Sequence, residues 1–579
     1  MKRMRGVGAV LLVVIVMVGG AFLLRRSLAV TAADGPVAQA SWPPAHMNLS
    51  GRTSLLDSSD ADIEAVQVDG GDRVLVAVWT DGKSAAESAG SIRIKWKFES
   101  DDYWRRPSVQ LPEWSSTYVY KYPALALHKS GSSVIAHVVW YHQNTSTSQN
   151  DVYYTTCTLS ASGGTCEGGS QVSPSTTQAI SAPDIALDEA GYPHIVWSQD
   201  TYIFYRYKLP PSAGANPVWG VPLQVEGRYQ LSGGGFFGGD ETSFPARGKG
   251  PVIAVRGYWQ DEENPGKVYV AWDRDCDVEG DKPSSAGCGI WFAVRDTAGL
   301  FAGTELEEIY RWRFNDISTI GTDLGSDEKN SLYDERPAIA VGDNHVYVAW
   351  QRLETIKPEF GGINCYEHAV AYRVFHGSNV AADWWLGGDD DTQLAYVNRP
   401  ADAYRSYTVQ TEDEFYGGVR PAIDVVGDVL HMAWQYESTE TCDGGGGGGG
   451  GQSILPEAGV HASGEDFFDT YVYTVTYAYA DHATLGGEIS WEATTPMTSP
   501  LRIDIQQIRA DEQFFTNPDL AILPDQTVPH PHVVLLNRFA TGNDYGFHIW
   551  YANDKVFLSG GQDEPGPVYL PVIIRNYPK

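Results

Sequence analysis

Residues 337–350 read PAIAVGDNHVYVAW, and this phrase decides the fold. A proline opens a short apolar strand, Gly-Asp-Asn provides a polar turn, and a second apolar strand ends in tryptophan. Apolar and aromatic runs on either side of a turn are typical of a β-hairpin. The phrase recurs in four further copies, which run from Pro123 to Trp140, from Pro183 to Trp197, from Pro251 to Trp272 and from Pro421 to Trp434.

Two divergent copies bracket these five. Ile63 leads to Trp79 without the proline, and Pro518 leads to Leu535 in place of the tryptophan. A third strand rich in tyrosine and β-branched residues follows each copy, and each copy leaves room for a fourth. Seven copies between residues 61 and 558 average roughly seventy residues, more than the ~40–50 of compact propeller blades.

This repetition predicts an all-β chain, a seven-bladed β-propeller of four-stranded antiparallel blades. Six or eight blades, and tandem sandwiches, are the alternatives. Sandwiches need Greek-key crossings, whereas plain hairpins repeat here, so we favour the propeller.

The lengths of the links assign the two faces. The turns from first to second strand are short, so the longer links must gather on the opposite face, where loops on a rigid scaffold concentrate binding residues. We expect that long-loop face to be the working surface. Its links are 273–289, 351–368 and 435–469 after the second strands, and 219–250, 296–336, 376–420 and 479–517 between repeats.

The repeated phrase resembles the blades of sialidase-like (BNR-repeat) β-propellers. That family usually carries Asp boxes, Ser-x-Asp-x-Gly-x-Thr-Trp, whereas Ser160–Thr165 and Asp296–Gly299 keep only their turn character. An Arg-Ile-Pro near the first blade, common in the family's enzymes, is absent from the sequence. The resemblance implies a diverged member without intact Asp boxes.

The family's carboxylate-clamping arginine triad has a partial counterpart. Arg336 and Arg420 directly precede the prolines of two repeats, and Arg247 lies four residues before that of another. Clustered guanidinium groups can bind a carboxylate bidentately. The alternative is that each arginine pairs with local acids such as Asp334 and Glu335.

Acidic pairs recur between repeats, and opposed carboxylates can act as acid and base on a glycosidic bond. Solvated acids on an acidic surface are the alternative. The catalytic candidates among them are Glu335 and Glu414. The pairs are Asp240-Glu241, Asp334-Glu335, Asp413-Glu414 and Asp511-Glu512.

One link carries five carboxylates at alternating positions, which predicts a calcium site because this ion takes six to eight oxygen ligands. An ordinary charged loop is the alternative. No other cofactor is expected. The proposed ligands are Asp273, Asp275, Asp277, Glu279 and Asp281.

Six cysteines suit an oxidising compartment. Cys157 with Cys166, and Cys276 with Cys288, are expected to pair locally. Cys365 and Cys442 would then tie two neighbouring loops. Zinc is the alternative, but no Cys-x-x-Cys spacing supports it.

The two ends of the chain do not belong to the repeats. Basic residues and an apolar run within 1–33 predict a signal peptide or an uncleaved membrane anchor. An extracellular or cell-surface location follows. The tail from Val568 to Tyr577 resembles one that recurs at the ends of exported bacterial proteins, which favours a bacterial source; a closing strand of the last blade is the alternative. We assign residues 34–60 to a linker, 61–558 to the propeller and 559–579 to a C-terminal tail.

Charge and missing motifs narrow the function. A formal net charge of −32 excludes nucleic acid as a partner, and membrane contact is expected only through an uncleaved N-terminal segment. No nucleophile elbow or zinc-protease motif is present, and His194, His431 and His532 are interpreted as structural. We therefore expect a propeller that binds glycan or extracellular protein through its long-loop face, without evident catalysis. The alternative is a sialidase-like glycoside hydrolase or lyase.

Overall fold

The structure is a computed structural model of the whole chain. It describes residues 46–49, 58–81, 91–99, 101, 104–105, 109–111, 117–209, 218–229, 244–258, 266–274, 289–296, 312–316, 331–343, 345–356, 365–376, 395–396, 417–437, 441–442, 473–481, 501–503, 514–523, 531–541, 544–553 and 557–558. Within these residues there are strands and turns but no helix, and so no helix able to cross a membrane.

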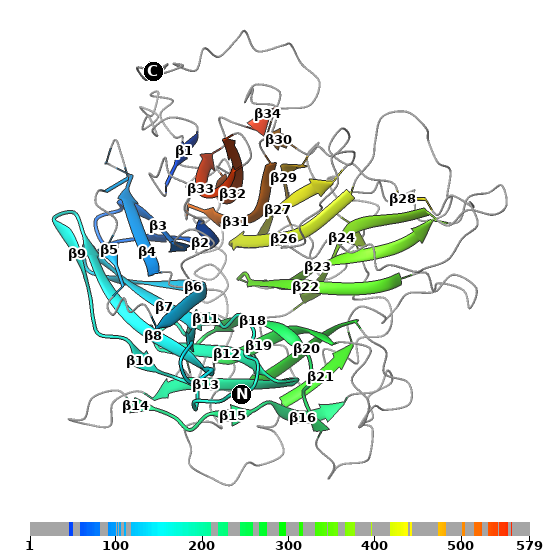
Figure 1. Cartoon of the computed structure of the whole chain (residues 1–579), viewed down its shortest axis with the longest axis horizontal. Coiled ribbons are helices and arrows are strands. Elements are labelled where there is room, and N and C mark those ends of the chain that lie inside the picture. Colours follow the sequence, from blue (N-terminus) through cyan, green and yellow to red (C-terminus); the bar gives the residue numbers. More distant parts are fainter. Residues whose placement is uncertain are drawn as a thin grey trace, which may run out of the picture. The chain divides into compact units, whose positions relative to one another are not determined.

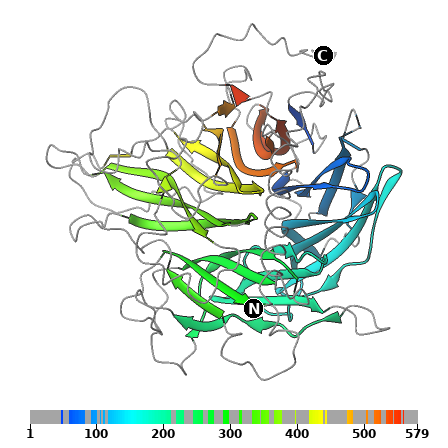
Figure 2. The ribbon, with the colours of Figure 1, turned by 180° about the vertical axis from the view of Figure 1, so that it is seen from behind.

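The described strands form seven sheets, which succeed one another in chain order (Figures 1 and 2). We name each sheet by its first strand. The β2 sheet contains β2 (Ser58–Gln67), β3 (Arg73–Asp81), β4 (Ser91–Phe98) and β5 (Val109–Gln110). The β6 sheet contains β6 (Tyr118–Ser130), β7 (Ser133–Asn144), β8 (Gln149–Ser160), β9 (Gly163–Cys166) and β10 (Ser170–Gln171). The β11 sheet contains β11 (Asp184–Leu187), β12 (Pro193–Gln199), β13 (Tyr202–Leu209), β14 (Val218–Trp219) and β15 (Leu223–Gln224).

The remaining sheets repeat this plan. The β18 sheet contains β18 (Lys249–Arg256), β19 (Lys267–Arg274), β20 (Gly289–Asp296) and β21 (Trp312–Asp316), extended by β16 (Glu226–Tyr229) and β17 (Phe244–Pro245). The β22 sheet contains β22 (Ser331–Val341), β23 (His345–Ile356), β24 (Cys365–His376), β25 (Ala395–Tyr396) and β28 (Thr441–Cys442). The β26 sheet contains β26 (Gly417–Val426), β27 (Val429–Glu437), β29 (Tyr473–Asp481), β30 (Leu501–Ile503) and β34 (Phe557–Leu558). The β31 sheet contains β31 (Phe514–Ile522), β32 (Pro531–Thr541), β33 (Asp544–Asn553) and β1 (His46–Asn48).

The first strands lie against one another. Each contacts the first strand of the next sheet along the chain, and β31, in the last sheet, contacts β2 in the first. Sheets whose first strands meet in this way form a β-propeller, and the predicted all-β propeller class is confirmed.

The last sheet includes strands from both ends of the described chain. Met47 pairs with Tyr551, and the Leu49 N–H donates to the Ile549 carbonyl at 2.8 Å. Strand β1 falls in the segment that the sequence analysis assigned to a linker. One strand from the N-terminal side thus completes a sheet whose other strands lie near residue 550.

The core lies between consecutive sheets rather than inside one. Tryptophans near the ends of the second strands have 0–2% of their surface exposed, as in Trp197, Trp272 and Trp350. Each cluster of buried side chains joins two neighbouring sheets: Trp272 and Val270 of β19 pack with Val196 and Tyr205 of the β11 sheet. Fully burying such a side chain contributes about 1.5–3 kcal/mol, so sheet-to-sheet contact is the main source of stability.

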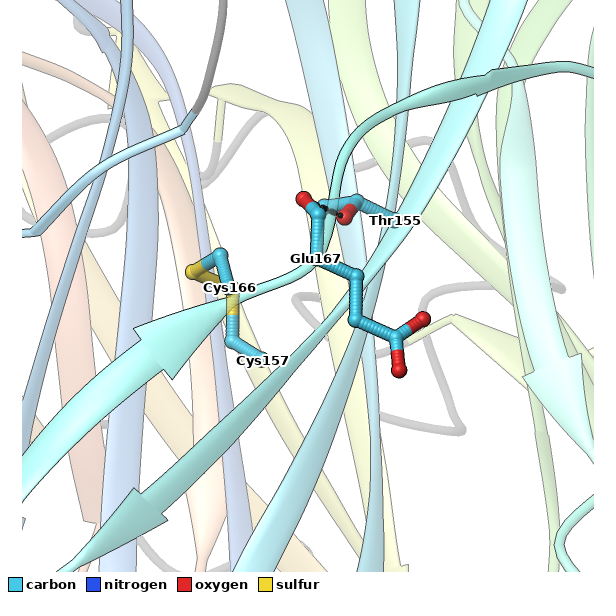
Figure 3. The surroundings of a disulfide bond; sticks show 4 residues. All are labelled: Thr155, Cys157, Cys166 and Glu167. Carbon is cyan, nitrogen blue, oxygen red and sulfur yellow. Dashed lines mark hydrogen bonds between the residues drawn. A yellow bond between two sulfur atoms is a disulfide. The ribbon is translucent and has the colours of Figure 1, made fainter.

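One disulfide is present among the described residues, between Cys157 of β8 and Cys166 of β9 (Figure 3). These cysteines are direct cross-strand partners, and the Thr155 hydroxyl donates to the Glu167 carbonyl at 2.8 Å beside them. The predicted local pairing is confirmed here, whereas Cys276 and Cys288 lie outside the described residues.

We predict a second cross-strand disulfide between Cys365 and Cys442. Strands β24 and β28 are antiparallel, with Cys365 opposite Cys442 in the same register relation that joins Cys157 to Cys166. Peptide mapping without reduction should recover the two peptides linked. Recovery of Cys365 and Cys442 as free thiols in protein from an oxidising compartment would contradict this pairing.

Candidate functional site

A repeated backbone irregularity marks one end of the first strands. Six of them shift register against their second strand over the two residues around the repeat's proline position. Such a shift is a β-bulge, which redirects side chains and is common beside binding sites. Five of the bulges place a residue in the left-handed region: Asp60 (φ 49°), Tyr122 (φ 53°), Gly250 (φ 52°), Arg336 (φ 56°) and Arg420 (φ 56°).

These five equivalent positions define what we call the mouth. They lie where the first strands begin, the end at which links from preceding sheets arrive. Left-handed backbone costs about 1–2 kcal/mol for a residue other than glycine, asparagine or aspartate. Glycine relieves this cost at position 250, yet Tyr122, Arg336 and Arg420 retain large side chains.

Asp60 connects two sides of the mouth electrostatically. It accepts hydrogen bonds from the Ser59 hydroxyl at 2.9 Å and from the Tyr122 backbone N–H. Burial raises the pKa of Asp60, while those hydrogen bonds and the charges of Lys121 and Arg420 act against the rise. Lys121 and Arg420 belong to different sheets, so Asp60 interacts electrostatically with cations of both.

Tyr122 supplies an accessible aromatic surface at the mouth. Its side chain is 39% exposed, one of three large apolar or aromatic residues so exposed among the described residues. Its ring centroid lies 6.2 Å from that of Tyr141, whose hydroxyl donates to the Asn150 Oδ1 at 2.7 Å. The tyrosine pair is therefore held in place from one side and open on the other.

The arginine candidates separate into two groups. Arg336 is exposed at the mouth, and the Arg420 backbone N–H donates to the Gln351 Oε1 at 3.3 Å. The bond from Arg420 links the β26 sheet to the β22 sheet, and within the β22 sheet the same glutamine donates from Nε2 to the Glu335 Oε1 at 3.1 Å. Arg247 instead stacks over the Tyr202 ring, 4.9 Å from its centroid.

Several predicted site residues lie outside the described residues. Glu414 is one, and four of the proposed calcium ligands, Asp275, Asp277, Glu279 and Asp281, are the others. Asp273 lies on β19, opposite Ile290 of β20. In the described part of the chain, no three or more acidic, histidine or cysteine side chains are grouped to hold a metal ion.

The structure adds a group of acids that the sequence analysis did not single out. They lie on the first strands, just inside the mouth. Protein atoms surround their side chains, and a fraction of each residue's surface remains exposed. The members are Asp62 and Glu64 of β2, Asp184 of β11, Asp424 of β26 and Asp519 of β31. We call them the axial acids.

The axial aspartates join neighbouring sheets through the backbone. Each accepts, on Oδ2, an N–H from the first strand of the next sheet. The bonds run from Leu125 to Asp62 (2.6 Å), from Ile253 to Asp184 (2.8 Å), from Ile522 to Asp424 (2.7 Å) and from Ile63 to Asp519 (2.7 Å). Counted from the proline position of its own repeat, the donor residue lies one position later than the aspartate in each of the four bonds.

Burial among other carboxyls makes these acids hold protons unusually well. Burial raises the pKa of Asp184 to about 7 and that of Asp424 to about 6, despite the N–H donors that favour the charged form. For Glu64, burial and the nearby charges of Asp424 and Asp519 raise the pKa well above its ordinary value.

The histidines of the second strands are structural, as predicted for His194 and His532. Their Nδ1 atoms lie 2.6 Å from the hydroxyls of Tyr205 and Tyr551 on the neighbouring strands. Burial lowers the pKa of His137 to about 3 and that of His431 to about 4, so both are neutral at physiological pH.

Comparisons with known proteins give remote likeness alone. No family model matches the chain, and no curated protein matches it. A protein of unknown function from Dyadobacter fermentans is similar at 9% identity and a TM-score of 0.34, over 88% of this chain and 99% of that one. A Trypanosoma rangeli sialidase in complex with the inhibitor DANA is similar at 9% identity and a TM-score of 0.32, over 67% of this chain and 54% of that one.

A third similar structure is an N-acetylgalactosamine deacetylase from F. plautii, at 11% identity and a TM-score of 0.26. The match covers 58% of this chain and 92% of that one. The chain thus spans about half the length of the sialidase that it resembles.

Asp184→Asn should make stability less dependent on pH. Aspartate ionises near pH 4 when unfolded but near pH 7 in the folded chain, so its contribution to stability falls as pH rises between these values. Relative to the variant, the wild type should lose on the order of 2–4 kcal/mol of unfolding free energy across that window.

Urea unfolding at about pH 5 and pH 8 measures this difference. Asp188→Asn is the matched control, because Asp188 accepts N–H groups of Ala190 and Tyr192 within the turn of the same hairpin. An equal difference in unfolding free energy between wild type and Asp184→Asn at both pH values would contradict the prediction.

Proposed function

We propose that this chain is an exported, seven-bladed binding propeller that recognises a glycan at its mouth, on the long-loop face. The seven sheets and the contact of β31 with β2 support the blade count. The predicted signal or anchor within residues 1–33 and the disulfide between Cys157 and Cys166 support an extracellular or cell-surface location.

The observation that carries the proposal is strain retained at the mouth. Strained residues persist where the surrounding fold enforces them, and they concentrate at ligand sites. Glycine serves the same bulge at position 250, so the geometry itself does not demand the side chains of Tyr122, Arg336 and Arg420.

The chemistry of the mouth suits a sugar. An exposed tyrosine offers an apolar face to a pyranose ring and a hydroxyl to its polar edge. Asp60 accepts hydrogen bonds, and the arginines donate them to hydroxyl, amide or carboxylate oxygens. A glycan that bears a carboxylate would use all three types of group.

Arg336→Gly tests this without disturbing the fold. Glycine suits the backbone at φ 56°, so the unfolding free energy should remain within about 1 kcal/mol of wild type. Binding on an array of neutral and carboxylate-bearing glycans should fall at least tenfold. Lys129→Ala removes an exposed cation from the opposite end of β6 and should bind as wild type does.

The array experiment also distinguishes the alternatives. Wild-type binding unchanged in Arg336→Gly, Arg420→Gly and Tyr122→Gly would refute the mouth as the site. Release of free sugar from an aryl-sialoside, lost in Arg336→Gly and Arg420→Gly, would identify a glycoside hydrolase instead. No glycan bound, together with capture of a defined extracellular protein, would assign a protein partner.

We also propose that the loop after β19 binds calcium through Asp273, Asp275, Asp277, Glu279 and Asp281. Five carboxylates supply enough oxygens for this ion, and the ion would offset their mutual repulsion. Calcium should raise the melting temperature of the full chain by several degrees, and a chelator should reverse the rise. An identical melting temperature in calcium and in chelator would end this proposal.

A further inference from the structure

We propose that a proton held between Asp62 of β2 and Asp519 of β31 closes the ring of first strands, and that its loss opens the seam between the first and last sheets. This inference concerns how the propeller closes and does not depend on the proposed ligand. It follows from how the two aspartates are bonded.

The two side chains are hydrogen-bonded to each other at the seam. Ionised carboxylates only accept hydrogen bonds, so a bond between two of them requires one proton. Asp519 also accepts the backbone N–H groups of Ile63, at 2.7 Å, and Leu520, which stabilise its charged form. Asp62 accepts the N–H of Leu125 at 2.6 Å, one donor against the two on Asp519, so we place the proton on Asp62, which donates to Asp519.

This seam differs from every other junction between consecutive sheets. Elsewhere, neighbouring first strands are joined by the chain that links one repeat to the next. Ile63 and Asp519 are 456 positions apart, so only non-covalent contacts hold β2 against β31. Strand β1 closes the outer edge of the last sheet on β33, and the aspartate pair closes its inner edge.

The charged groups that act most strongly on Asp62 are acids. They are Asp519 of β31, Glu64 of β2 itself and Asp184 of β11. Asp424 of β26 acts on Glu64, next to them. Ionisation of Asp62 would thus add a negative charge beside several acidic neighbours, and repulsion would act directly across the seam.

Basic groups on the packed strands are engaged elsewhere. Lys121 of β6 and Arg420 of β26 act on Asp60 at the mouth, and Lys129 of β6 pairs with Asp69 at 3.6 Å. On β32, which also packs against β2, His532 Nδ1 is bonded to Tyr551. On β3, Arg73 pairs with Glu99.

The remaining titratable groups of the strands packed against β2 and β31 are Asp81 of β3, Tyr118, Tyr120, Tyr122 and His128 of β6, Arg538 of β32, Asp544, Tyr545 and His548 of β33, His431, Tyr436 and Glu437 of β27, and Tyr473, Tyr477, Tyr479 and Asp481 of β29. Asp81 pairs with Arg93 at 3.1 Å. Tyr122 lies at the mouth, beside Asp60. His128 lies beside Gly191 of the β11 sheet's turn, at the far end of β6.

The direction of the pH effect follows from burial. Burial, and then the charge of Asp519, raise the pKa of Asp62 well above its ordinary value. Unfolded aspartate ionises near pH 4, so the pair's contribution to stability falls as pH rises from about 4 through the raised pKa. The seam is tightest in acid.

Asp62→Asn tests the proposal, because an amide can donate to Asp519 without titrating. At about pH 5 the variant should unfold at a urea concentration equal to or below that of wild type, and at about pH 8 above it. Buried His137 and His431 have the opposite pH dependence in both proteins, so the difference between the proteins is the informative quantity. Asp62→Ala should be less stable than Asp62→Asn at both pH values, since it can neither donate to Asp519 nor accept from Leu125.

Asp424→Asn is the matched control. It replaces an axial acid whose bond to Ile522 joins sheets that are consecutive in the chain. Because the pKa of Asp424 is raised only to about 6, its difference in unfolding free energy from wild type should change less between about pH 5 and pH 8 than that of Asp62→Asn, whose pKa is raised well above its ordinary value. If Asp62→Asn differed from wild type by the same unfolding free energy at both pH values, the proposal would be overturned.

A second measurement detects the proton itself. The infrared carbonyl band of protonated carboxylic acids in the folded full chain near pH 7 should lose the intensity of one acid in Asp62→Asn. An unchanged band would show that Asp62 carries no proton and would overturn the proposal even if the variant were less stable.

Discussion

The free edge of each first strand is the constraint on which the structure depends. A strand at the inner end of a sheet has no further strand to accept its outward N–H groups, and a buried N–H without an acceptor costs about 1–3 kcal/mol. Aspartates of the preceding sheet meet this need at Leu125, Ile253, Ile522 and Ile63. Each aspartate bond therefore does two things: it joins two neighbouring sheets, and it provides an acceptor for an N–H at the free edge of a first strand.

That solution explains why acids occupy an interior region of this chain. Hydrophobic contact between the broad faces of the sheets supplies most of the stability, but it does not fix how far one first strand lies from the next. A carboxylate that spans two backbones does fix it. The cost is several raised pKa values close together, and on β2 and β31 the acid, Asp62 or Asp519, directly follows the bulge.

Sequence alone predicted the hairpin repeat, the propeller class, the disulfide of Cys157 with Cys166 and the structural role of His194 and His532. Each depends on a local pattern. The axial acids were missed although Asp184 and Asp519 directly follow the repeat's proline, because a lone acid within an apolar phrase signals nothing until the neighbouring strand is known. Tyr122 was missed for a related reason: the bulge that exposes it depends on its register with β7. Arg336 and Arg420 were singled out because they precede that proline, and the structure places both at bulges.

Amide hydrogen exchange of the first strands tests the central claim most directly. If carboxylates accept the outward N–H groups, the amides of Ile63, Leu125, Ile253 and Ile522 should exchange as slowly as those in the middle of the second strands. Exchange at the rate of an open sheet edge, at these four positions in the folded chain, would contradict the account.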